Sequence, residues 1–597
     1  MANPAAEPVP QRPAWSENAL RVLRARYLRR HPANGEVCEG PEDLFRRVAE
    51  AVASVERLWP GDPGRERRSS EQFLQLFLDG VFLPNSPTLM NAGRELGMLS
   101  ACFVLPVEDS IESIFEALKH AALIQKAGGG TGFDFSRIRP EGDLVLSSGG
   151  RSTGPVSFLQ VFSTATSAIQ QGAFRRGANM GVLRVDHPDI VSFLHAKDRT
   201  TDLVNFNISV AVPDEFIRKA TAEPGAPHLV RNPRTGVEAP LPRAKGSSSV
   251  WSIGELFESI AERAWATGEP GILFLDRIQR DNMTPALGTI EATNPCSEQP
   301  LLPYEACTLG SINLAKLVRD GRFDEEALRR TARTAVRFLD DVVEASRYPI
   351  VPTERMCKLT RKIGLGVMGF ADLLFLLQLP YDSEEALALG ENIMRSLNDE
   401  AHAASEALAA ERGAFPAWKS SRWDTDRHRT QRNAAVTTVA PTGTISILAG
   451  CSGGIEPLFS LVFHRNILDG QSLPEVNPIF ERVAKERGFY SRGLLERILQ
   501  EGSIQQAPGV PDDVRRVFKT ARDVAPEVHI RMQAAFQRHC DSAVSKTINF
   551  ASDATVAQVK AMYLRAFHEG LKGVTVYRDG SRPGQPMALI PCETCAP

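Results

Sequence analysis

The sequence predicts an α/β protein with a mostly parallel sheet, preceded by a small helical domain. From about residue 85 onward, short apolar stretches alternate with amphipathic segments over several hundred residues. Parallel strands joined by helices produce this alternation, because each crossover helix returns the chain to the same end of the sheet. Before residue 80 the apolar residues follow helical spacing only, so we expect a helical domain over residues 1–80.

The first elements along the chain are helices. Residues 17–31 and 42–58 carry apolar side chains at helical spacing, and in the second segment Leu44, Val48 and Val52 share one face. A charged, glycine-containing break at 61–70 separates them from another short helix. We interpret this group as a helical cap on a larger core.

The following elements alternate between strand and helix. The apolar runs predict strands at 101–106, 132–138, 203–212, 434–440 and 573–577. Helical periodicity predicts helices at 110–126, 155–171, 253–267, 324–346 and 384–411. Residues 221–249 are rich in Pro, Gly, Arg and Ser and predict an excursion or hairpin, and residues from 580 onward lose periodicity.

Composition excludes several classes of function. The 597-residue chain has a net charge of −3, so no strong field favours nucleic acid or an anionic membrane. No apolar run reaches the roughly 18 residues of a membrane span. Residues 1–15 lack an apolar signal core, so we expect a cytoplasmic protein. The nine cysteines are too scattered for a secreted disulfide framework, which favours catalytic or metal-binding roles for clustered ones.

The Cys296 thiol has two polar neighbours in the sequence, Asn294 and Glu298. If this loop is extended, alternate side chains point the same way and all three can face one substrate. A thiol beside an amide and a potential general base suits chemistry on a hydroxylated carbon. The alternative, at about even odds for this motif alone, is a structural cysteine with loop-capping neighbours.

Two further cysteines form a potential dithiol. Cys102 begins an apolar strand, and Cys307 ends a proline-bounded stretch. A free cysteine is often only a small core residue. A disulfide needs Cα atoms roughly 4.4–6.8 Å apart, which sequence spacing cannot establish. If the two meet, the set comprises one reactive thiol and one pair able to give up two electrons.

The chain ends in a Cys-x-x-Cys motif, Cys592 and Cys595. This spacing is used in redox exchange. The alternative is half of a zinc site, but no second Cys-x-x-Cys or Cys/His pair lies nearby in the sequence. A redox pair on a flexible arm is therefore the favoured interpretation.

Two loops could bind anionic ligands, and a third, glycine-rich loop is considered as a phosphate loop and excluded. Residues 440–446, APTGTIS, follow an apolar strand and could present backbone N–H groups and hydroxyls to a phosphate, although a plain turn is commoner. Residues 171–177 place two arginines between glycines, and the alternative there is a solvated turn. Residues 128–132 are glycine-rich but precede a strand and lack Gly-Lys-Ser/Thr, so we exclude P-loop and Rossmann motifs.

Taken together, several segments resemble the catalytic chain of ribonucleotide reductases, most closely the adenosylcobalamin-dependent (class II) type. The resemblance runs from about Phe82 to Arg582. Besides the Cys102 strand and the 440–446 loop, the segments that carry it are FLPNSPTLMN (82–91), GANMG (177–181), NFNIS (205–209), NPCSE (294–298), EACTL (305–309), GLGVMG (364–369) and VTVYRDG (574–580).

The resemblance implies a ten-stranded α/β barrel of two parallel half-sheets over residues 81–583, with Cys296 at the tip of a central finger loop and a redox tail over 584–597. In that family the matching cysteine becomes a thiyl radical and removes the 3′ hydrogen of the ribose. The residue matching Glu298 takes the 3′-OH proton, and the one matching Asn294 holds the sugar.

The resemblance also implies a path for electrons. The pair matching Cys102 and Cys307 reduces the 2′ position and becomes a disulfide. The tail pair, Cys592 and Cys595, would exchange with that disulfide, and thioredoxin or a glutaredoxin-like protein would reduce the tail again.

Binding residues carry over in the same way. The implied substrate contacts are Ser86, Ala101, Thr442, Gly443, Thr444 and Ser446. Asp109 and Arg139 match positions that bind a dNTP or ATP specificity effector at the interface of a homodimer, with the 110–126 helix packed against its twin. The loop that transmits effector identity would contain Gln171, Gly172, Arg175 and Arg176. The N-terminus lacks the Val-x-Lys-Arg-Asp-Gly pattern of the ATP-cone, so no overall activity site is expected.

The radical source separates the types within the family. The metal-dependent type needs a radical-bearing small subunit and two adjacent tyrosines near the C-terminus, whereas here Thr575 and Val576 stand there with only Tyr577 beside them. The glycyl-radical type needs an Arg-Val-x-Gly-Tyr-like tail and usually lacks the counterpart of Glu298. Adenosylcobalamin remains, with diphosphate substrates favoured. A class I-type large subunit is the alternative, and a nucleotide-binding regulator without chemistry is disfavoured because the core residues are present.

Overall fold

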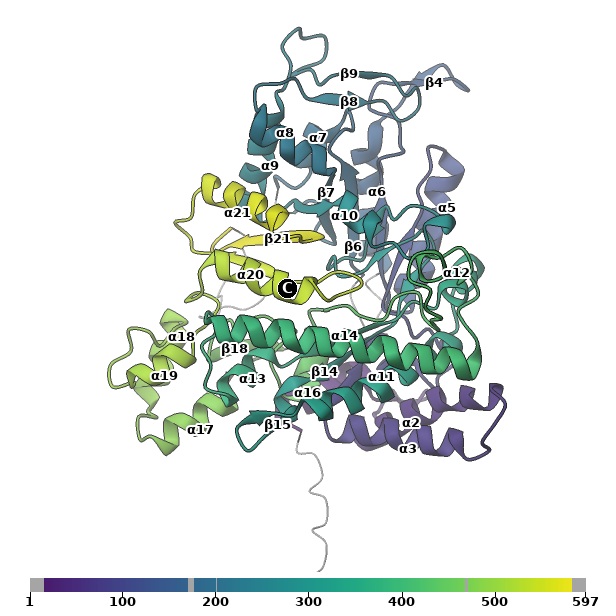
Figure 1. The fold of residues 1–597 in the computed structure, drawn as a ribbon. Coiled ribbons are helices and arrows are strands. Elements are labelled where there is room, and N and C mark those ends of the chain that lie inside the picture. Colours follow the sequence, from purple (N-terminus) through teal and green to yellow (C-terminus); the bar gives the residue numbers. More distant parts are fainter. Residues whose placement is uncertain (1–14, 170–176, 200, 468–470, 582–597) are drawn as a thin grey trace, which may run out of the picture.

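The computed structural model describes residues 15–169, 177–199, 201–467 and 471–581. Helices surround a central set of strands (Figure 1). Residues from about 110 to 280 form the upper part of that view, and the N-terminal helices lie in the lower part. Within the described ranges, no helix is both long and apolar enough to cross a membrane.

The N-terminal segment is helical, as predicted. Helix α1 (Glu17–Val22) continues into a π-helical turn (Leu23–Tyr27), and α2 (Pro41–Ala53) and α3 (Arg65–Leu78) follow. The helix predicted at 42–58 ends early, and its last residues form a 3-10 helix, Ser54–Leu58. The predicted apolar face of α2 is buried.

The first run of strands is parallel throughout. Each strand pairs in parallel with the next in the order β2, β3, β6, β7 and β10. Their bounds are Cys102–Leu105, Gly130–Asp134, Asn179–Arg184, Phe206–Val212 and Gly271–Phe274. This run contains three of the predicted strands, with ends displaced by at most four residues.

A second parallel run uses later parts of the chain. It begins with β14 (Leu309–Asn313) and β17 (Gly364–Met368) and ends with β20 (Thr547–Phe550) and β21 (Gly573–Arg578). Between them lies the segment predicted as a strand at 434–440. Only Thr437 and Val439 form bridges there, to Leu365 and Val544. One reason is that the Val436 amide donates to the Asp541 carboxylate, at 2.8 Å, instead of to a strand.

Two antiparallel contacts join the runs into a barrel. Strand β10 pairs antiparallel with β21, and at the other edge β13 (Ala306–Cys307) pairs antiparallel with β2. Because β13 leads directly into β14, the two runs of five close on each other within the described residues. A short strand, β1 (Phe82–Pro84), adds antiparallel to β14. The structure thus has the expected α/β barrel of two parallel halves.

The predicted helices are present, with ends displaced by at most two residues. They are α5 (Ile111–Lys126), α6 (Gly154–Ile169), α9 (Ile253–Thr267), α11 (Glu325–Ala345) and α14 (Glu384–Arg412). Further helices include α4 (Ser86–Asn91), α12 (Val351–Thr360), α13 (Phe370–Leu376), α16 (Ile445–Ala449), α20 (Pro526–Gln537) and α21 (Val556–His568). The predicted excursion contains a hairpin, β8 (Leu229–Arg231) and β9 (Glu238–Pro240).

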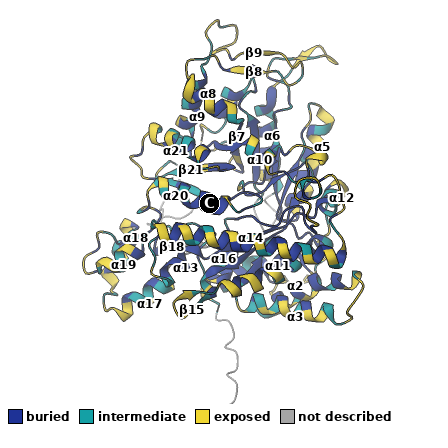
Figure 2. Cartoon of the chain, viewed as in Figure 1, coloured by how far each residue is buried: buried dark blue, intermediate teal, exposed yellow. Residues whose placement is uncertain are grey.

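The N-terminal helices share one hydrophobic core with the second half of the barrel. The rings of Phe73 and Phe77 in α3 lie edge-on to Phe338 of α11, with centroids 5.0 and 5.4 Å apart. Phe82 of β1 joins the same cluster. Along α11 and α14, buried and exposed residues alternate (Figure 2), as one-sided packing against this core requires.

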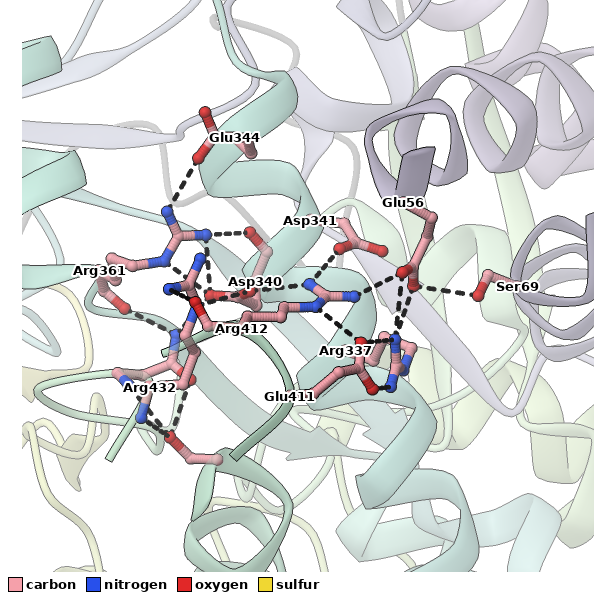
Figure 3. A network of polar contacts seen from close by, with 12 residues as sticks. Glu56, Ser69, Arg337, Asp340, Asp341, Glu344, Arg361, Glu411, Arg412 and Arg432 are labelled. Carbon is pink, nitrogen blue, oxygen red and sulfur yellow. Dashed lines mark hydrogen bonds and ion pairs between the residues drawn. The ribbon is translucent and has the colours of Figure 1, made fainter. Parts of the chain in front are cut away.

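A buried network of charges crosses the same interface (Figure 3). The Arg412 side chain, at the end of α14, is 0% exposed and forms ion pairs with Glu56 (2.7 Å), Asp341 (2.6 Å) and Asp340 (2.9 Å). Arg361 and Arg432 also bind Asp340. Buried charges are tolerated only when they are paired, so the network requires the N-terminal segment, α11 and α14 to meet in one arrangement.

Replacing Arg412 should therefore be costly. We expect Arg412→Met to lower the free energy of unfolding by about 3–5 kcal/mol, because buried Asp341 loses its arginine and buried Glu56 and Asp340 each lose one of theirs. Urea unfolding measures the change. The matched control is Arg492→Ala, which removes an exposed pair with Glu496 and should cost at most about 0.5 kcal/mol. Equal effects of the two substitutions would contradict a stabilising role for the network.

Candidate active site

The Cys296 segment forms the tip of a finger inside the barrel. Its two arms are the paired strands β11 (Ala292–Thr293) and β12 (Pro300–Leu301). The tip is a tight turn, because the Ser297 amide donates to the Asn294 carbonyl at 3.0 Å and Ser297 has φ of +66°. The loop is therefore not extended, and the alternation of side chains that an extended loop would give does not apply to Asn294, Cys296 and Glu298.

Both halves of the barrel hold the finger. A Cβ atom on Gly132 of β3 would lie 1.9 Å from the Thr293 carbonyl oxygen, so this close approach requires glycine. Asn207 of β7 donates to the Pro295 carbonyl at 2.8 Å. From the second half, the Ala543 amide donates to the Glu298 carbonyl at 2.9 Å. The glycine-rich stretch at 128–132 thus supports the finger, in agreement with the exclusion of a P-loop.

Cys102 and Cys307 lie directly opposite each other. They are register partners in the antiparallel pair of β2 and β13, and both are buried. Burial raises the pKa of the Cys307 thiol well above its usual value, and a hydrogen bond with Cys102 and the nearby Glu298 carboxylate add to the effect. Cys307 is therefore a protonated thiol at neutral pH. The structure thus brings the two cysteines together, a proximity that sequence spacing could not establish.

The finger links this thiol pair to Cys296. The Asn294 amide nitrogen lies 3.5 Å from the Cys102 sulfur and donates to it. Asn294 and Glu298 are both buried, whereas Cys296 is exposed. The turn therefore presents the amide and the carboxylate toward the thiol pair and the Cys296 thiol toward open space.

That open space is a cavity of about 460 Å³ between the two halves of the barrel. Its wall is largely apolar, with Met180, Phe459 and Val576 among the lining residues. Cys296 and Pro441 line it together, so the 440–446 loop reaches the same cavity as the finger tip. The cavity also touches Tyr577.

An ion pair in the cavity wall was missed by sequence reasoning. Lys546 and Glu456 both line the cavity and pair with each other, and the Lys546 side chain is 0% exposed. The Thr547 amide donates to the second Glu456 oxygen at 2.6 Å, and Lys546 lies 2.8 Å from Nδ1 of buried His529. Burial lowers the pKa of both Lys546 and His529. No local pattern signals such a pair, because its members come from distant segments.

The predicted substrate residues lie at the edges of this centre. Thr442 has φ of +54° and its hydroxyl accepts from the Gly454 amide at 2.8 Å; Gly443 next to it is exposed. Thr444 is the N-cap of α16, and Ser446 is buried in that helix. Beside the thiol pair, the Ala101 amide donates to the Cys307 carbonyl at 3.1 Å.

Ser86 depends on a residue that the sequence did not indicate. Its hydroxyl lies 2.7 Å from the hydroxyl of Tyr27, which is buried at the end of the π-helical turn. The N-terminal helices therefore reach a candidate substrate residue of the barrel domain.

The two predicted effector residues contact each other. The Arg139 side chain pairs with Asp109 at 2.8 Å, and the Arg139 amide donates to the same carboxylate at 3.1 Å. Near them, α5 exposes Ile111, Phe115 and Leu123. Two groups of predicted residues lie outside the described residues: the loop residues Gln171, Gly172, Arg175 and Arg176, and the tail pair Cys592 and Cys595.

Comparison with known families matches both parts of the chain. Residues 100–577 match the ribonucleotide reductase barrel domain, and residues 15–97 match the all-alpha domain of the same family. A solved structure, the class Id ribonucleotide reductase alpha subunit of Actinobacillus ureae, has the same fold with a TM-score of 0.76. It is 23% identical and covers 95% of this chain and 97% of its own.

Two curated relatives are much more similar in sequence. A Mycobacterium tuberculosis protein (strain CDC 1551) called vitamin B12-dependent ribonucleoside-diphosphate reductase is 51% identical over 95% of this chain and 80% of its own. A Thermoplasma acidophilum protein of the same name is 45% identical over 97% of this chain and 81% of its own. With both domains matched and relatives 45–51% identical over nearly the whole chain, the chain belongs to the ribonucleotide reductase family.

Proposed function

We propose that this chain is an adenosylcobalamin-dependent ribonucleoside-diphosphate reductase. One observation carries the proposal: Cys102 and Cys307 face each other in register beside a finger whose tip presents Cys296 to a cavity. This arrangement supplies a thiol for radical chemistry and a thiol pair for two-electron reduction at one place. The names of the M. tuberculosis and T. acidophilum relatives support the cofactor and the diphosphate substrate.

The cavity wall fits such a cofactor. Its apolar residues suit the faces of a large ring, and Glu456, 30% exposed, offers carboxylate oxygens to hydrogen-bond donors such as the amide side chains of cobalamin. We infer that Glu456, Phe459 and Val576 help to hold it beside Cys296. When bound, adenosylcobalamin supplies a radical by homolysis of its cobalt–carbon bond.

The chain's own residues then perform the reduction. The Cys296 thiyl takes the hydrogen from C3′ of the ribose while the Glu298 carboxylate takes the 3′-OH proton and Asn294 holds the sugar. One thiol of the pair protonates the 2′-OH, which leaves as water, and the pair then delivers its second hydrogen to C2′. The pair gives up two electrons in all as its disulfide forms, and Glu298 returns its proton to the 3′ oxygen. Cys296 finally returns the hydrogen to C3′. The raised pKa of Cys307 suits this role, because only a protonated thiol can protonate the leaving group.

Substrate binding, regulation and reductant follow from the same proposal. The loop at 441–446 and Ser86 contact the substrate. Asp109 and Arg139 bind a dNTP or ATP effector, and the exposed apolar residues of α5 pack against the same helix of a second subunit. Thioredoxin or a glutaredoxin-like protein reduces the tail pair Cys592 and Cys595, which in turn reduces Cys102 and Cys307.

The first prediction from this proposal concerns thiol reactivity. In native protein at neutral pH, iodoacetamide should label exposed Cys296 and Cys38 before buried Cys102 and Cys307. Because the pKa of Cys307 is raised, its labelling should accelerate only at a pH above the usual thiol range. Peptide mass spectrometry measures each rate, and Cys307 labelled as fast as Cys38 at neutral pH would contradict the buried pair.

The second prediction concerns the radical source. The purified chain with adenosylcobalamin, effector and CDP should form deoxynucleotide without any added protein subunit, and Cys296→Ser should abolish turnover. Cys38→Ser, which removes an exposed cysteine away from the finger, is the matched control and should retain activity. Strict dependence on an added metal-containing subunit would favour the class I-type alternative. A parallel assay with CTP tests the choice of diphosphate.

The third prediction concerns the tail. Cys592→Ser should allow a single turnover from the pre-reduced Cys102–Cys307 pair but block repeated turnover with thioredoxin. Quantifying product per enzyme separates the two cases. Full thioredoxin-driven activity in this variant would contradict the role of the tail as a shuttle.

A further inference from the structure

The excursion at 221–249 contacts a hairpin that lies next to the candidate effector pair, Asp109 and Arg139. This hairpin consists of β4 (Leu144–Val145) and β5 (Gly150–Arg151), which lie beside β8 and β9 at the top of Figure 1. We propose that the excursion is a clamp on this hairpin, with Asn232 and Arg234 as positioning residues for a nucleoside triphosphate effector. The inference rests on the proposed function, whose effector site it extends.

The contact converges on one carboxylate, Asp143, at the start of the hairpin. Arg234 donates to both of its oxygens, at 2.8 and 2.6 Å, and the Asn232 amide donates to it at 3.2 Å. The hydrogen bonds from Arg234 hold the pKa of Asp143 well below its usual range. A bidentate arginine–carboxylate pair fixes orientation as well as distance. The excursion therefore holds Asp143, at the start of the hairpin, in a defined position.

The turn of the excursion is organised for this contact. The Asn232 side-chain oxygen accepts from the amides of Arg234 (2.9 Å) and Thr235 (3.1 Å), which is an Asx-type turn. The same side chain therefore shapes the turn with its oxygen and binds Asp143 with its nitrogen. The turn therefore already holds the two donors, Asn232 and Arg234, in place beside Asp143.

The excursion is itself anchored to the barrel. The Arg231 amide donates to the Asp186 carbonyl at 2.7 Å, just beyond β6. Nε2 of buried His228 lies 2.9 Å from the Val185 carbonyl, and Val230 and Leu241 are buried in the core of the first half. The clamp thus connects a rigid strand end to an exposed hairpin, whose Leu146 is 73% exposed.

Asp143 is the neighbour in sequence of a residue that the candidate effector pair contacts. Arg139 donates to the carbonyl of Leu144, the residue after Asp143, at 2.9 Å, while its guanidinium also binds Asp109. Loss of Arg234 would release the hairpin and leave the Asp143 charge uncompensated near the arginine expected to meet an effector. Both effects weaken binding of a polyphosphate, the second through like-charge repulsion.

The test measures effector binding directly on the full chain. Isothermal titration with dATP, dGTP and dTTP should show that Arg234→Ala weakens binding of the effectors by about tenfold, within the range of typical coupling between sites. Turnover without effector should be unchanged. A charge swap, Asp143→Arg with Arg234→Asp, should recover most of the lost affinity, which a general loss of folding would not allow.

A matched control lies on the same excursion. Arg243 pairs with Glu255 of α9 and lies 4.9 Å over the Trp251 ring, so it ties the excursion to the helix rather than to the hairpin. Arg243→Ala should leave effector affinity unchanged. Wild-type affinity in Arg234→Ala would overturn the clamp, and so would an equal loss in Arg243→Ala.

The outcomes also separate the clamp from the proposed chemistry. A wild-type chain that reduces CDP but binds none of the three nucleotides overturns the clamp and leaves the reductase proposal standing. A chain that binds effectors, loses affinity in Arg234→Ala and yet forms no deoxynucleotide retains the clamp and refutes the reductase proposal.

Discussion

The antiparallel seam between β2 and β13 is the contact on which the rest of the structure depends. It closes the barrel on one side, and it also places Cys307 opposite Cys102. Because β13 continues into β14, the second parallel run starts at the thiol pair. The finger then fills the space between the halves, with Gly132 allowing its backbone to approach β3. The same strand pairing therefore closes the barrel and brings Cys102 and Cys307 together.

Three deeply buried cations each have a carboxylate partner. Arg412 pairs with Glu56, Asp340 and Asp341, Lys546 pairs with Glu456, and Lys362 pairs with Glu305 at 2.7 Å. Glu305 also accepts from the Leu302 amide and thereby supports the turn that precedes Cys307. Such pairs add little net stability but penalise any arrangement that separates them. They specify how the helical domain, the cavity wall and the β13 turn are positioned.

The candidate regulatory elements lie on the first half of the barrel. Helix α5 follows β2, the hairpin at 144–151 follows β3, and the excursion at 221–249 links this hairpin to the end of β6. Strand β6 lies beside β3 in the sheet, and β3 contacts the finger. A physical connection between the 144–151 hairpin and the finger therefore runs through two adjacent strands.

The sequence by itself determined the alternation of strands and helices, the helical N-terminus and the local motifs around Asn294, Cys296 and Glu298, because periodicity and neighbouring residues are local properties. Through the resemblance it also indicated the barrel and the three thiols. Tertiary structure alone decided that Cys102 faces Cys307, that the finger tip is a turn that leaves Cys296 exposed, and that Lys546 meets Glu456 and Arg234 meets Asp143. These contacts depend on register and closure between distant segments, which no local pattern encodes.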